Sequence, residues 1–217
     1  MPTIPYKDKN GQRLQGITTV KGQQLGWGKQ PLMIWANKQG LDGRTLNEAR
    51  DTATIPGTIA HLLIESHLKQ IPADVNDYPK SDLHNGVIAY HNFIQWTEQF
   101  KFKPIEVEPH LVSEKYQLGG TPDVIAEVMG KLCVIDWKTG RTYEDLFLQL
   151  QAYKLFWEEN HPEMPITGGF HVLRIPKNED IPSFHHSHWQ TLPPEATESI
   201  EAILTLRRCQ GVLKKLL

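Results

Sequence analysis

Two β-prone runs on either side of a tight turn constrain this chain more than any other feature. Residues 121–128 and 131–137 are rich in strand-forming types, and Met-Gly at 129–130 separates them. Such runs around a Gly-containing dipeptide are typical of a β-hairpin. Counting outward from the turn places Asp123 opposite Asp136. The sequence therefore predicts two carboxylates at the open end of one hairpin.

Lys138 adds a cation to these two acids. Side chains alternate along a strand, so Lys138 lies on the same face as Asp136. Facing carboxylates repel each other unless a cation lies between them, and oxygen ligands of this kind suit Mg²⁺ or Mn²⁺. A neighbouring ammonium can stabilise a developing anion or orient a water. The spacing also fits a solvated hairpin end whose lysine neutralises two acids, so the pattern alone leaves both interpretations open.

A resemblance to a known family favours the first interpretation. Pro-Asp at 122–123 followed by Asp-Trp-Lys at 136–138 resembles the signature of the PD-(D/E)XK nuclease superfamily. Gln-Leu-Gln-Ala-Tyr at 149–153 resembles the Gln-xxx-Tyr motif of its RecB-like branch. Gly-Thr-Ile-Ala-His at 57–61 resembles the helical segment that carries a His in that branch. The order of the motifs is also that of the family.

The resemblance implies a centre with one or two Mg²⁺ or Mn²⁺ ions. Asp123, Asp136 and the backbone carbonyl of Trp137 would be ligands, and His61 would join them. An imidazole ligand beside two carboxylates makes Mn²⁺ competitive with Mg²⁺.

Glu114 is a further candidate ligand. If Gly-Gly at 119–120 forms a two-residue turn, Tyr116 faces Asp123 and Glu114 falls on the same side of the sheet. Glu114 could then hold a second ion directly or through water. A surface role for Glu114 fits the sequence equally well.

The remaining motif residues have implied roles in positioning and contact. Lys138 would position the attacking water or offset charge on the phosphate. Gln149 would bond near the active site, and Tyr153, four residues later, shares its helix face. Tyr153 would pack against or hydrogen-bond to the DNA backbone, although a core role suits its apolar surroundings too. Arg141, three residues after Lys138, is expected on the substrate side.

The element pattern predicts an α/β (α+β) fold with a central mixed sheet flanked by helices, and the resemblance implies a restriction-endonuclease-like core. We expect one domain over 1–217, with a helical N-terminal part at about 17–103, a nuclease core at about 108–190 and a C-terminal helix at about 194–217. The expected helices are 31–39, 45–53, 56–69, 82–102, 144–159 and 194–217. The expected strands are 110–118, 121–128, 131–137, 169–175 and 184–190.

Composition limits the function further. The net charge of −2 gives no global support for nucleic-acid binding, so any such surface needs locally concentrated positive charge. Two cysteines cannot supply the four thiolates of an iron–sulfur cluster, so none is expected. No apolar run reaches the roughly 18 residues of a membrane helix, and the N-terminus lacks the apolar region of a signal peptide. We therefore expect an intracellular protein, in a bacterial or phage-infected cell if the resemblance holds.

The resemblance implies a metal-dependent DNA nuclease, with exonuclease as the preferred mode, in recombination, repair or phage genome processing. Its partner would be DNA, single-stranded or at duplex ends. Two alternatives remain, a non-catalytic DNA-binding module and a nuclease subunit that is active only with a helicase. The chain has no GxxxxGK[ST] motif, so a motor would come from a partner.

Outside these motifs, the His-rich run at 185–188 stands out. Alternation places His186 and His188 on one face, where they could chelate Ni²⁺ or Zn²⁺. No acid or cysteine joins them in the sequence, so we interpret the run as a partly exposed strand.

Overall fold

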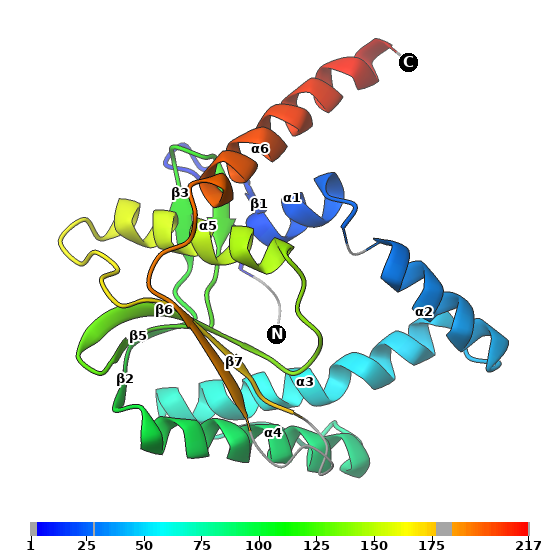
Figure 1. Cartoon of the computed structure of the whole chain (residues 1–217). Helices are drawn as coiled ribbons and strands as arrows, with labels where there is room; N and C mark the ends of the chain where they lie inside the picture. Colours follow the sequence, from blue (N-terminus) through cyan, green and yellow to red (C-terminus); the bar gives the residue numbers. More distant parts are fainter. Residues whose placement is uncertain (1–3, 28, 177–183, 217) are drawn as a thin grey trace.

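The chain folds into three layers, with helices on both faces of a central sheet (Figure 1). This computed structural model describes residues 4–27, 29–176 and 184–216. The helices are α1 (Ile17–Gln24), α2 (Lys29–Leu41), α3 (Leu46–Lys69), α4 (Lys80–Gln99), α5 (Asp145–Asn160), α6 (Glu195–Leu213) and the 3-10 turn η1 (Lys214–Leu216). The strands are β1 (Gln15–Gly16), β2 (Phe102–Val107), β3 (Leu111–Ser113), β4 (Leu118–Gly120), β5 (Val124–Val128), β6 (Lys131–Lys138), β7 (Gly169–Arg174) and β8 (His185–Trp189).

The sheet is mixed, which confirms the predicted α/β arrangement. Five strands lie in the order β2-β5-β6-β7-β8, and only β6 and β7 are parallel to each other. Helix α5 forms the crossover between these two strands, as parallel neighbours require. A smaller sheet, β1-β4-β3, packs beside α5.

The β5–β6 hairpin has the predicted turn and register. Met129 and Gly130 both have positive φ, 53° and 80°, which matches the right-handed twist of the strands they join. The ladder runs from the pair Val128–Lys131 to the pair Val124–Ile135. The residues that follow this last pair are Asp123 and Asp136, so both acids lie at the open end of the hairpin.

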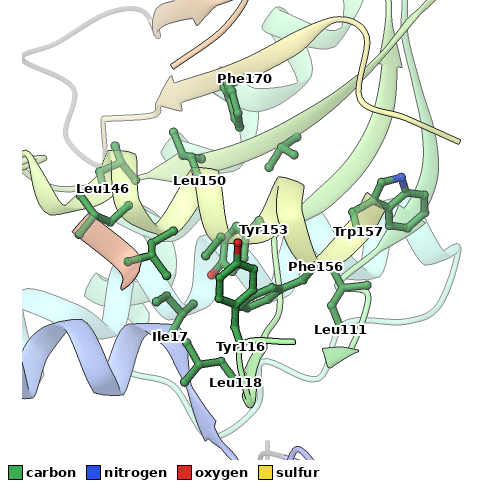
Figure 2. Packing of buried hydrophobic residues seen from close by; sticks show 14 of the residues in the cluster. Ile17, Leu111, Tyr116, Leu118, Leu146, Leu150, Tyr153, Phe156, Trp157 and Phe170 are labelled. Carbon is green, nitrogen blue, oxygen red and sulfur yellow. The ribbon is translucent and has the colours of Figure 1, made fainter. Parts of the chain in front are cut away.

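One core layer lies between the sheet and helices α1, α5 and α6. Figure 2 shows Tyr153 and Phe156 of α5 among side chains from several elements, including Ile17 and Leu118. Leu150 of the same helix is fully buried. The helix that carries the Gln-xxx-Tyr motif is therefore fixed by its own apolar side chains.

The second core layer holds α3 against α4 and the other face of the sheet. Residues predicted as two helices, 45–53 and 56–69, form the single helix α3 with Pro56 inside it. Proline lacks the N–H that a helix interior uses. Burial of Ile59 and Ile64 in this layer compensates for the missing hydrogen bond. Helix α4 packs closely here, since an added Cβ on Gly86 would be 2.4 Å from Ile59.

The predicted single strand over 110–118 is wrong, because a turn interrupts it. It is two short antiparallel strands, β3 and β4, with the turn after Ser113. The two glycines at 119–120 lie inside β4, where an added Cβ would come within 2.0 Å of the Tyr6 ring and 2.9 Å of the Tyr153 ring, respectively. Their small size serves packing instead of a turn.

Two segments differ from the individual helices and strands expected, although the second lies within the predicted helical part. Residues 102–107, partly assigned to the end of a helix, form the edge strand β2, where Pro104 is tolerated next to a register shift. Residues 17–24 form α1 although Ile, Thr and Val are modest helix formers. In the part of the chain that the structure describes, no helix is long and apolar enough to cross a membrane.

Candidate active site

Asp123 is held at the end of the hairpin by the neighbouring strand. Its Oδ2 accepts a hydrogen bond from the Trp137 backbone N–H at 2.8 Å. The Asp123 side chain is 15% exposed, so one edge of the carboxylate remains open to a ligand. The hairpin geometry therefore fixes the direction of this carboxylate before anything binds.

Asp136 is the more deeply buried of the two acids, with its side chain 2% exposed. Its Oδ2 lies 2.5 Å from Lys138 Nζ, an ion pair between two residues on one face of β6. This oxygen is buried and has no hydrogen-bond partner of good geometry among the described residues. A buried carboxylate oxygen without a hydrogen-bond donor is costly unless a cation compensates it.

His61 reaches Asp123 from α3. Its Nδ1 is 3.3 Å from Asp123 Oδ1, and its ring is tilted beside Trp137 at 6.2 Å between centroids. Gly57, one turn earlier, permits the approach, since an added Cβ would lie 2.6 Å from Thr139 Oγ1. The Gly-xxx-His spacing thus places the imidazole against the hairpin end.

Gln149 connects Asp136 to two further side chains. Its Nε2 lies 2.8 Å from the Tyr153 hydroxyl and 3.4 Å from Asp136 Oδ1. Its Oε1 accepts a hydrogen bond from Lys21 Nζ at 2.9 Å. Lys21 is buried in α1 and also forms an ion pair with Asp145 at 3.0 Å. Because Lys21 can only donate, it orients the Gln149 amide with its NH₂ toward Asp136.

Burial and neighbouring charges divide the roles of the two acids. Burial alone would raise the pKa of Asp123, but His61, Lys138 and the Trp137 N–H outweigh it and lower that pKa. Burial raises the pKa of Asp136 to about 6, with repulsion from Asp123 adding to the effect against the attraction of Lys138. Asp136 is therefore the carboxylate whose negative charge is under-compensated.

The two bases respond to the same charges. Burial would lower the pKa of His61, yet the contact with Asp123 outweighs burial and raises it. Burial likewise opposes the charge of Lys138, but Asp136 and Asp123 raise its pKa. Lys138 is thus a cation over the whole neutral range.

A second acidic group lies behind Asp123. The Glu108 N–H donates to the Asp123 carbonyl at 3.0 Å, and Lys69 Nζ lies 2.7 Å from Glu65 Oε1 and 3.8 Å from Glu108 Oε2. Burial and the nearby charge of Glu65 raise the pKa of Glu108. Lys69 already neutralises part of this group, so we assign no ion to it.

The structure brings together most of the residues that the sequence singled out. His61, Asp123, Asp136, Lys138 and Gln149 share one end of the hairpin, as the contacts above show. The roles of these residues as ligands and catalysts remain predictions. Neither the spacing nor any motif pointed to Lys21, which meets Gln149 across 128 positions of the chain.

Two of the site residues lie where one of their alternatives placed them, and the register assumed for Glu114 needs correction. Glu114 lies in the turn of the β3–β4 hairpin, at the end opposite Gly120, and its carboxylate accepts from the Lys9 N–H. The register that placed it beside Asp123 is therefore wrong. Tyr153 is 3% exposed and its hydroxyl accepts from Gln149, which is the core position that the sequence left open, and a role for it in DNA contact stays a prediction.

Comparisons with known proteins identify the family. The family model described as the PD-(D/E)XK nuclease superfamily matches residues 35–213. The chain therefore belongs to the PD-(D/E)XK nuclease superfamily, and its mixed sheet between helical layers is consistent with the restriction-endonuclease-like fold. No curated protein matches the chain. A solved structure titled "Crystal structure of SSO0001" is 18% identical, with 68% of this chain and 71% of that chain covered and a TM-score of 0.31.

Nucleases of this superfamily generally use divalent metal ions, so the site can be tested for its fit to one. In the described ranges of the chain, no three His, Cys, Asp or Glu side chains form a ready-made metal cluster. The donor types themselves fit, because the His61 imidazole lies 3.3 Å from Asp123 Oδ1 and Asp136 supplies a second carboxylate, whose buried Oδ2 faces the Lys138 ammonium. Hard oxygen donors of this kind suit Mg²⁺ and Mn²⁺.

Proposed function

We propose that this protein is a metal-dependent DNA nuclease that hydrolyses phosphodiester bonds at the end of the β5–β6 hairpin. The observation that carries the proposal is the buried Asp136–Lys138 ion pair beside Asp123, within the family's sequence motifs. A structural salt bridge would not need a second buried acid next to it, because that acid adds repulsion.

The metal would be Mg²⁺ or Mn²⁺, held by Asp123, Asp136, the Trp137 carbonyl and His61. When bound, such an ion lowers the pKa of a water and stabilises negative charge on the phosphate oxygens.

The chain's own residues have separate tasks at this site. Asp136 holds the Lys138 ammonium in place, where it can orient a water or stabilise charge that develops on phosphorus. Gln149 supports the other oxygen of Asp136 and thereby limits the rotation of its carboxylate. Binding through phosphate gives little sequence specificity, since phosphate contacts position DNA without reading bases.

The RecB-like motifs support an exonuclease mode, with a role in recombination, repair or phage genome processing. Linear and closed circular DNA, each single- and double-stranded, would be digested with Mg²⁺, Mn²⁺ or EDTA. We expect loss of linear but not circular DNA, only with metal. Lys138→Ala should lower the rate by roughly 10²- to 10³-fold, the usual cost of removing one transition-state donor.

The matched control is Lys103→Ala, which removes a lysine from a cross-strand ion pair elsewhere in the same sheet. Lys103 Nζ lies 3.2 Å from Glu127, and its side chain is 66% exposed. This variant should cleave like the wild type. If wild type and Lys138→Ala are equally inert while DNA still binds, the isolated chain is not a nuclease. A binding module or a partner-dependent subunit would then be the better account.

A further inference from the structure

An open cavity lies beside the candidate active site. Its volume is about 330 Å³, and β7, β8 and the start of α5 bound it. Arg174 of β7 lines this cavity and is the register partner of Lys138 in the neighbouring strand. Adjacent strands are about 5 Å apart and register partners point to the same face. The cavity therefore adjoins the hairpin end through two neighbouring cations, Lys138 and Arg174.

Arg174 is available to a ligand. Its side chain is exposed, and within the described ranges it forms no ion pair. The backbone beneath it is fixed, because the N–H of Ile175 donates to the Lys138 carbonyl at 2.9 Å. An arginine on a fixed strand end, with no ion pair to any of the described residues, is well placed to bind phosphate.

The rest of the cavity is aromatic and polar. Tyr143 and Trp189 line it, and Trp189 is held edge-on by Phe147 with ring centroids 5.1 Å apart. Ser187 supplies a hydroxyl, and Glu144 is the acid among the lining residues. A bare phosphate needs no aromatic wall and is repelled by Glu144, whereas an apolar ligand needs no arginine.

A nucleotide has a chemical partner for each of these groups. Its phosphate suits Arg174, its base can stack on Tyr143 or Trp189, and exocyclic amino groups can donate to Glu144. Arg141 places a second cation near the aromatic wall of the cavity, because its guanidinium lies 5.5 Å from the centre of the Tyr143 ring. A paired base could not enter, because its faces and edges are engaged within the duplex.

We propose that this cavity binds an unpaired nucleotide next to the scissile phosphodiester, so that the preferred substrate is single-stranded DNA or a frayed duplex end. The position of this nucleotide next to a cleaved phosphodiester rests on the proposed nuclease function. The binding of an unpaired nucleotide stands on the cavity itself and can be measured without cleavage.

The test compares Arg174→Ala, Arg174→Lys and Tyr143→Ala with Arg208→Ala, which removes an exposed arginine of α6 outside the cavity. Binding of a fluorescent single-stranded oligonucleotide and of a blunt duplex would be measured by anisotropy in EDTA over a range of salt. Arg174→Ala and Tyr143→Ala should each weaken single-strand binding about tenfold, and Arg174→Ala should reduce the salt slope by about 1. Arg174→Lys should recover part of the affinity, and deoxyadenosine monophosphate, which has an exocyclic amino group, should compete better than inorganic phosphate.

Cleavage with Mg²⁺ or Mn²⁺ separates the two proposals. Arg174→Ala should raise KM about tenfold with little change in kcat. If Arg174→Ala binds and cleaves like Arg208→Ala, the nucleotide cavity is refuted while the nuclease stands. If the wild type cleaves nothing but binds single strands, and Arg174→Ala loses that binding, the proposed nuclease function is refuted and the nucleotide cavity stands. Equal affinity for single strands and blunt duplex in the wild type would overturn the preference for unpaired nucleotides.

Discussion

At the scale of single residues, the charge of Asp136 depends on a chain of contacts that begins in α1. Lys21 Nζ donates to Gln149, whose amide NH₂ then faces Asp136 and Tyr153. Side chains that hydrogen-bond to the neighbours of a metal-binding carboxylate orient that carboxylate and affect its affinity for metal. Lys21 is therefore a positioning residue, because it acts through Gln149 and has no direct contact with Asp136 among those that the structure shows.

Replacing Lys21 should weaken the site without removing any ligand. We expect Lys21→Met to lower activity or Mn²⁺ affinity about 10- to 100-fold, the usual range for such partners. Lys21→Arg should restore much of it, since Arg also donates and stays charged. The measurement is the Mn²⁺ concentration that gives half-maximal cleavage, with Lys29→Met of α2 as the control. If the activity of Lys21→Met falls only in proportion to its fraction of folded protein and the Mn²⁺ midpoint is unchanged, the role of Lys21 is purely structural.

At the scale of elements, the helix with the Gln-xxx-Tyr motif and strand β4 meet at a glycine. A Cβ on Gly120 would lie 2.9 Å from the Tyr153 ring, which the buried core around it prevents from moving (Figure 2). The packing of α5 on β4 thus sets the position of Gln149, one turn from Tyr153.

Adding one methyl group at this contact should therefore be costly. We expect Gly120→Ala to lower the free energy of unfolding by about 1–3 kcal/mol, the usual cost of overpacking. Gly211→Ala in α6 is the matched control, because an added Cβ there meets nothing within 4 Å. That change should be neutral or stabilise by up to about 1 kcal/mol, since Ala is the better helix former. Equal denaturant midpoints for the two variants would contradict this view of the contact.

At the scale of the whole molecule, we expect a histidine cluster to make stability depend on pH. His171 of β7 lies 2.8 Å from His186, and its ring centroid is 4.4 Å from that of His188. The sequence pattern paired His186 with His188 but did not reveal that the 6%-exposed His171 joins them. Burial, with repulsion from His188 and His186, lowers the pKa of His171 from 6.5 to about 3.

The sign of the effect follows from these two pKa values. Between pH 6.5 and about 3 the unfolded chain binds a proton at His171 that the folded chain does not bind, so stability falls as pH falls. From pH 7 to pH 5 the loss from this group should be about 2 kcal/mol. His171→Gln cannot titrate and should reduce the pH dependence measured by urea unfolding relative to wild type. Parallel pH curves for His171→Gln and wild type would contradict the assignment.

Local chemistry in the sequence determined the hairpin and its acids. A turn that needs positive φ at residues 129–130 fixes the register, and period-two alternation then places Asp123, Asp136 and Lys138 together. The amphipathic helices and most strands follow from the same short-range patterns. These features survive without knowledge of the rest of the molecule, because each depends on residues within one hairpin or one helix.

Tertiary packing decided what surrounds those acids. Gly119 and Gly120 have the composition of a turn, yet two tyrosine rings occupy the space beside them, and this moves Glu114 away from the site. Lys21 comes from a helix 128 positions away from Gln149, and Arg174 from the neighbouring strand, so no spacing within one element reveals them. Residues more than a hundred positions apart meet only through close packing of the layers, and the sequence pattern of a single element carries no record of that contact.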